Sequence, residues 1–187
     1  MTNMSQIWVD RGLLDILSIF TYDYGRMRYA REISGSMELP SKTVSRKLER
    51  ADSMGLIKHT YQGKNKLYYL DLVMERTFHI LMALESYKTM RFVSENRRIA
   101  LILEKYPTKL VFGSFAKFKK GNDIDIVFFS KPDISEDIVH PQYTTKVDLR
   151  KRLSKKEALA LEIADNHIIL SDHEFFVRLF MEHYKNG

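Results

Sequence analysis

Residues 110–129 of the chain read LVFGSFAKFKKGNDIDIVFF, and the C-terminal half can be understood from this segment. Its first three residues form an apolar run typical of a buried strand, and Gly113-Ser114 is typical of a turn. A second apolar run contains Asp123-Ile124-Asp125-Ile126. Successive residues of a strand point to opposite faces, so every second residue shares a face. The segment therefore predicts two strands, the second carrying two carboxylates on one face, about 6–7 Å apart.

Asp123 and Asp125 would repel each other unless a cation lies between them. Mg²⁺ is the simplest occupant, because it binds carboxylates together with phosphate oxygens. The Gly113-Ser114 turn supplies backbone amides and a hydroxyl that suit phosphate. A third acid on a neighbouring strand would complete a site for two metal ions, and Asp148 is the candidate because it lies in the strand-like run 143–149.

This order of features resembles the signature of the minimal nucleotidyltransferases of the DNA polymerase β superfamily, over about residues 96–184. The resemblance implies transfer of an NMP group from an NTP to an unknown acceptor, with two Mg²⁺ ions and release of pyrophosphate. The residues expected to bind the nucleotide are Gly113, Ser114, Lys117 and Lys119, and those expected to bind metal and catalyse the reaction are Asp123, Asp125 and Asp148.

Two other interpretations of this domain stay open. Phe118 stands where the family has a second glycine in the loop, so the domain is alternatively a catalytically inactive fold that only binds a nucleotide or a partner protein. The chain would then be a transcriptional regulator. Families with this minimal domain also include antitoxins that modify a toxin, which makes a protein acceptor a further candidate.

The N-terminal third predicts three helices followed by a hairpin. Apolar residues recur at helical spacing from Leu13 to Phe20, and shorter helical patterns cover residues 29–34 and 41–54. Two extended runs, 56–61 and 67–72, flank a polar turn. This order resembles the winged helix-turn-helix of prokaryotic regulators, over about residues 10–72.

Basic and polar residues lie on the outer face of the third helix and at the tip of the hairpin. Such a helix can lie in the major groove of DNA, while lysines of the hairpin contact the flanking phosphates. We therefore expect binding to double-stranded DNA, the alternative being a winged helix used only for protein contacts. The expected DNA-binding residues are Lys42, Thr43, Ser45, Arg46, Lys47, Lys64 and Lys66.

Residues 73–93 contain neither proline nor glycine and predict one long connecting helix. This helix either joins two copies of the chain in a homodimer, as winged-helix proteins that read two half-sites require, or packs against its own domain. We expect two domains of α+β class. Residues 1–93 would form the winged helix-turn-helix and its connector, and residues 94–187 a nucleotidyltransferase fold with a small mixed sheet flanked by helices.

Composition limits the other possibilities. The chain has 187 residues, a net charge of +6 and no cysteine, which excludes disulfides, thiolate metal sites and thiol nucleophiles. No apolar run approaches the ~20 residues of a membrane span, so we expect a soluble, cytoplasmic protein without a membrane partner. The six histidines lack paired ligand spacing and are interpreted as surface or packing residues. A basic cluster at 146–156 is either a solvated helix start or a surface for a phosphate-rich or acidic acceptor.

Overall fold

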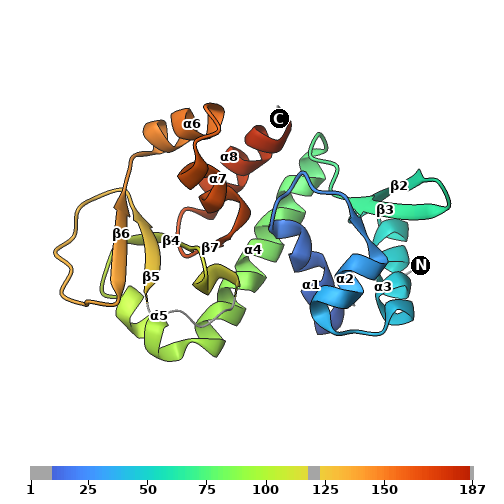
Figure 1. Cartoon of the computed structure of the whole chain (residues 1–187), viewed down its shortest axis with the longest axis horizontal. Helices are drawn as coiled ribbons and strands as arrows, with labels where there is room; N and C mark the ends of the chain where they lie inside the picture. The colour runs from blue at the N-terminus through green and yellow to red at the C-terminus, as the bar shows by residue number, and fades with distance from the viewer. Residues whose placement is uncertain (1–9, 118–122, 186–187) are drawn as a thin grey trace. The chain divides into compact units, whose positions relative to one another are not determined.

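The computed structural model describes residues 10–117 and 123–185, and the chain falls into two compact units (Figure 1). The first unit ends at Leu84 and the second begins at Glu85. Helix α4 spans Glu75–Glu95, so the division lies inside this helix and not after residue 93, where the sequence suggested it. The fold class is α+β, as expected.

The first unit contains three α-helices and a small antiparallel sheet. The helices are α1 (Arg11–Ser18), α2 (Ala30–Met37) and α3 (Ser41–Ser53), and a 3₁₀ turn, η2 (Ile19–Thr21), follows α1. The strands are β1 (Arg28–Tyr29), β2 (Lys58–Gln62) and β3 (Asn65–Tyr69), in the order β1-β3-β2. The helices and the β2–β3 hairpin agree with the sequence-based expectation, whereas the short strand β1 was not expected.

Apolar stripes on the helices form the core of this unit. Leu13 and Leu17 of α1 are buried, and so are Val44 and Leu48 of α3, one helical turn apart. Gly55, at φ 69°, follows α3 in the left-handed conformation that ends many helices. The buried stripe of α3 turns the opposite side of the helix outward.

The second unit is built on a four-stranded mixed sheet in the order β6-β5-β4-β7. Strands β5 and β6 are parallel, and β4 pairs antiparallel with both β5 and β7. The strands are β4 (Thr108–Phe112), β5 (Ile124–Phe128), β6 (Val139–Tyr143) and β7 (His167–Ile169). The helices are the end of α4, α5 (Arg97–Leu103), α6 (Lys146–Ser154), α7 (Ala158–Asp165) and α8 (His173–Lys185), with a 3₁₀ turn, η3 (Phe115–Lys117), after β4.

Strand β5 alternates between two environments, as the sequence predicts. Ile124 and Ile126 are fully buried, in a cluster with Phe92 of α4 and Leu103 of α5. Asp125 lies on the opposite face of the sheet. Because directly paired residues share a face, Asp125 lies in one row with its partners on the neighbouring strands.

One expected strand is absent. Residues 143–149 do not form a strand: β6 ends at Tyr143 and α6 begins at Lys146. The Thr145 hydroxyl caps the helix by accepting a hydrogen bond from the Asp148 amide at 3.0 Å. The Thr-x-x-Asp pattern therefore acts as a helix start, and it outweighs the weak alternation of the run.

Candidate functional site

The Gly113 turn and Asp125 meet at one end of the central strand pair. Phe112, the last residue of β4, pairs with Asp125 on β5. Gly113 then turns with φ 74°, and a Cβ placed on it would lie 2.7 Å from Asp125 Oδ2. Only glycine permits this approach, because any side chain would collide with the carboxylate. Two parts of the predicted site are thus brought together, and the adjacent Ser114 is exposed.

The two predicted carboxylates differ in exposure. The Asp123 side chain is 53% exposed, whereas Asp125 is half-buried. Burial raises the pKa of Asp125 above its ordinary value; His140 opposes this, while the charges of Asp123 and Glu162 add to it. A half-buried carboxylate beside two further acids gains from a bound cation, which would offset the repulsion.

His140 is a neighbour of the pair that sequence reasoning missed. It lies on β6 directly opposite Asp125 in the parallel register, and its Nε2 is 3.8 Å from Asp123 Oδ1. Nothing in the local sequence VHPQY marks this position. Only the pairing of β5 with β6, which is set by tertiary structure, places the imidazole beside the carboxylates.

Asp148 is not part of this arrangement, which corrects the sequence-based assignment. Its carboxylate accepts a hydrogen bond from the Thr145 hydroxyl at 3.0 Å, in the first turn of α6. Helix α6 follows Tyr143, which pairs with Phe128 at the end of β5 away from Asp125. Among the described residues, no group of three or more His, Cys, Asp or Glu side chains is arranged to hold a metal ion.

Of the two lysines predicted to bind the nucleotide, the structure describes the backbone of one. Lys117 ends the single 3₁₀ turn η3, and Lys119 lies outside the described residues, as does Phe118. The described part of the segment after Ser114 is this 3₁₀ turn.

A buried ionisable cluster lies on the other neighbour of β4. Strand β7 carries His167, whose Nε2 lies 3.0 Å from Oε1 of Glu85 on α4. Lys88 Nζ lies 2.8 Å from Glu85 Oε2. The His167 Nδ1 faces the carbonyl oxygens of Ile163 at 3.1 Å and Ala164 at 3.0 Å. Carbonyls only accept, so Nδ1 carries a hydrogen.

The cluster is almost wholly shielded from solvent, with Glu85 and His167 fully buried and Lys88 2% exposed. Burial alone would raise the pKa of Glu85, but the charges of Lys88 and His167 together lower it to about 2. Burial lowers the pKa of Lys88 and also that of His167. The carbonyl of Asn166, the residue before His167, accepts a hydrogen bond from the Gly113 amide at 3.3 Å.

In the first unit, the predicted DNA-binding residues lie on α3 and the hairpin but differ in accessibility. Lys42 and Arg46 are exposed on α3, and Lys64 is exposed at the hairpin tip. Lys47 is engaged within the protein, because its Nζ lies 2.6 Å from Asp10 Oδ1 and its side chain is only 20% exposed. The remaining three predicted residues, Thr43, Ser45 and Lys66, are half-buried.

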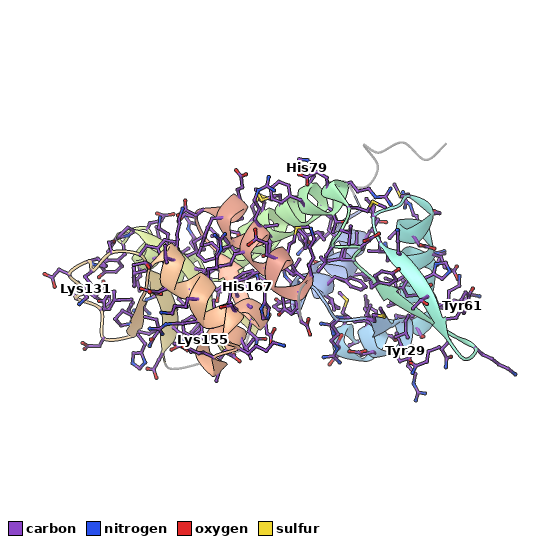
Figure 2. All side chains as sticks on the ribbon, turned by 90° about the horizontal axis from the view of Figure 1, so that it is seen from above. Tyr29, Tyr61, His79, Lys131, Lys155 and His167 are labelled. Atoms are coloured by element: carbon purple, nitrogen blue, oxygen red, sulfur yellow. The ribbon has the colours of Figure 1, made fainter. Side chains whose placement is uncertain are left out.

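A groove of about 710 Å³ brings several of these residues together. Ser45 of α3 and Lys64 and Lys66 of the hairpin line it, and Arg31 of α2 adds a cation that the sequence analysis did not select. Glu32 and Glu49 also line the groove, so its charge is mixed. Figure 2 labels Tyr29, another lining residue, and Tyr61, which lies on the hairpin strand β2 with a 61% exposed side chain.

No helix within the described residues is long and apolar enough to cross a membrane. Comparisons of the chain with models of protein families, with curated proteins and with solved structures gave no match.

Proposed function

We propose that the chain is a DNA-binding protein whose second unit transfers an NMP group from an NTP to an acceptor. The observation that carries the enzymatic part is the contact between the Gly113 turn and Asp125, with Asp123 immediately before β5 and near enough for its charge to act on Asp125. A glycine turn in contact with one of two neighbouring carboxylates suits a phosphate group and its cations.

Asp123 and Asp125 fit Mg²⁺, because both offer carboxylate oxygens and Asp125 pays a cost for its charge in the protein alone. When bound, Mg²⁺ would neutralise the triphosphate and the leaving pyrophosphate. The exposed Ser114 hydroxyl would orient the phosphates. An acceptor hydroxyl then forms a bond to the α-phosphorus, the bond to pyrophosphate breaks, and the hydroxyl proton passes to solvent.

The enzymatic proposal is tested with α-labelled NTPs and Mg²⁺, by following transfer of label to protein or nucleic acid. Asp123→Asn should abolish transfer, because it removes an exposed carboxylate of the pair. Asp148→Asn is the matched control and should retain transfer, since its carboxylate accepts a hydrogen bond from the Thr145 hydroxyl at the start of α6. Loss of transfer in both variants alike would contradict this assignment of roles.

The DNA-binding part rests on the first unit, which we interpret as a winged helix with α3 in the major groove and the hairpin against the backbone. Arg46→Ala should weaken duplex binding and reduce the salt slope of the affinity by about 1. Arg178→Ala, on α8 of the second unit, is the control and should leave both unchanged. If the two variants behave alike, α3 is not the DNA-contacting helix. A homodimer would present two such helices to two half-sites.

One observation favours the second candidate function, a regulator whose second unit binds a nucleotide or a partner protein without turnover. Asp148, the expected third acid, lies on α6 and not beside Asp123 and Asp125. Nucleotide binding without any transfer of label would establish this candidate and remove the enzymatic one.

A further inference from the structure

The basic cluster seen in the sequence covers exposed positions of α6 and the two residues that follow the helix, Lys155 and Lys156. Leu149 and Leu153 are the buried residues of this helix, one turn apart. Two residues further along, at about 200° around the helix, Lys151 and Lys155 point directly away from that stripe. Lys155 is labelled in Figure 2, on the outer surface of the second unit. We call Arg150, Lys151, Lys155 and Lys156 the α6 basic face; all four are exposed.

Acidic residues neutralise only part of this charge. Arg150 lies 3.5 Å from Glu182, a pair in which both side chains are more than half exposed. Within the described residues, Lys151, Lys155 and Lys156 have no carboxylate within ion-pair distance. The one acid of the helix, Asp148, is engaged with Thr145 at the start of the helix. The α6 basic face therefore carries a concentrated, poorly compensated positive charge.

A groove of about 230 Å³ runs along the edge of this face, between α6 and α8. Arg150 and Lys156 line it on the α6 side, together with the Ser154 hydroxyl. Its remaining lining consists of Leu153, Leu179, the imidazole of His183 and Glu182, the acid that lies near Arg150. Cations beside an apolar and ring-bearing surface match a strand whose phosphates and bases are both accessible.

We propose that the α6 basic face and its groove bind a single-stranded nucleic acid. Phosphates of the strand would lie along Lys151 and Lys155, and a base would enter the groove against Leu179 and His183. An acidic protein would use the cations but not the groove, so the observations favour nucleic acid. The further identification of this strand as the acceptor of the NMP group rests on the proposed function, whereas the binding itself does not.

The test measures binding of a fluorescent single-stranded oligonucleotide to the full-length protein by anisotropy, over a range of salt concentrations. Every protein carries Arg46→Ala and Lys64→Ala, so that the first unit contributes less. Lys151→Glu with Lys155→Glu should reduce the salt slope by about 1.4, since each phosphate contact on a single strand contributes about 0.7. The affinity should fall by at least tenfold.

The matched control reverses two cations without ion-pair partners in the described residues of the same unit, Arg97→Glu with Arg98→Glu at the start of α5. The control should bind like its parent, and an equal loss in both would overturn the proposal, because only the total charge would matter. Lys151→Gln with Lys155→Gln removes the charges without reversing them and should give a smaller loss of the same kind. Melting curves establish that all variants are folded.

A competitor separates the two classes of polyanion. Polyglutamate of equal charge should displace the strand poorly, and efficient displacement would assign the face to an acidic protein and overturn the proposal. Label transfer is scored separately: binding without transfer contradicts the enzymatic proposal alone, whereas transfer unaffected by the α6 variants contradicts the role of this face in holding the acceptor.

Discussion

Gly113 and Asp125 show how one missing side chain shapes the candidate site. Gly113 carries only a hydrogen where other residues have a Cβ, and Asp125 Oδ2 lies in the space that this leaves. A Cβ there would come within 2.7 Å of this oxygen. The residue also adopts φ 74°, a conformation that other L-residues adopt at a cost of about 1 kcal/mol or more. The sequence identified both residues, because a Gly-Ser turn and an Asp-x-Asp strand are local patterns.

Gly113→Ala should lower the free energy of unfolding by about 2–3 kcal/mol and weaken nucleotide binding, because backbone strain and the collision with Asp125 act together. Gly63→Ala is the control. Gly63 has a similar φ of 60° but nothing lies within 4 Å of its Cβ position, so only the strain cost applies. Chemical denaturation and nucleotide titration measure the two effects. Equal losses of stability at both positions would show that the close approach to Asp125 is unimportant.

Asp125→Asn should slightly stabilise the metal-free protein at pH 7. The pKa of Asp125 is raised by burial and by nearby acids, so its contribution favours folding below the ordinary value of 3.8 and is lost as the pH rises through the folded-state pKa. An uncharged amide removes this cost at neutral pH. The melting temperature should rise more for Asp125→Asn than for Asp123→Asn, which only relieves the repulsion, and Mg²⁺ should stop stabilising the protein in both. A fall in melting temperature would contradict the electrostatic argument.

Secondary-structure elements were predictable where a single periodicity governs them. The helical stripes of α1 and α3 and the alternation in β5 follow from residues that are neighbours in the chain. The start of α6 was misread because Tyr143 to Leu149 alternates weakly, while the informative signal was the Thr145-x-x-Asp148 cap. The position of His140 could not be predicted, because it depends on the register between two strands and not on either strand alone.

The role of Asp148 as a cap can be measured directly. Asp148→Ala should cost at most about 1 kcal/mol of stability, the ordinary effect of removing a residue that supports a helix start. Thr145→Ala should cost about the same, because its hydroxyl makes both hydrogen bonds of the cap. Neither change should alter Mg²⁺ or nucleotide affinity. A selective loss of metal affinity in Asp148→Ala would restore it to the metal site.

For the molecule as a whole, the sequence predicted two units, but it did not predict where the boundary between them lies. The helical pattern of 73–93 is continuous, so nothing in it marks the division between Leu84 and Glu85. The sequence analysis did not single out Glu85 or Lys88, although both are buried against the second unit's own residues. A buried charge is recognisable only once its partner is known, and His167 lies 82 residues away along the chain.

Glu85→Gln should lower the free energy of unfolding by about 3–5 kcal/mol, because it leaves Lys88 buried without its carboxylate. Glu95→Gln, on the same helix, is the control. Its side chain is 40% exposed and lies 2.7 Å from Arg91, so the loss should stay below about 0.5 kcal/mol. Urea denaturation followed by circular dichroism compares the two. Similar losses in the two variants would mean that burial of the cluster adds nothing to the free energy of unfolding.

The same cluster predicts sensitivity to acid. The pKa of Glu85 is lowered to about 2 from an ordinary value of 4.5, so its stabilising contribution is present above pH 4.5 and is lost as the pH falls towards 2. His167, whose pKa is lowered from 6.5, acts in the same direction, because the unfolded chain takes up a proton first. Stability should begin to fall below pH 6.5 and drop most steeply between 4.5 and 2. In Glu85→Gln the steep part should be shallower.

The close approach of Gly113 to Asp125 also constrains how this protein can diverge. A methyl group at the first position requires the carboxylate at the second to move or to be replaced by a shorter side chain, and even then the backbone conformation stays unfavourable. In a library that randomises both codons, folded variants should therefore keep Gly113 and Asp125 or change both residues together. Variants with a substitution at residue 113 alone should be lost under selection for folding.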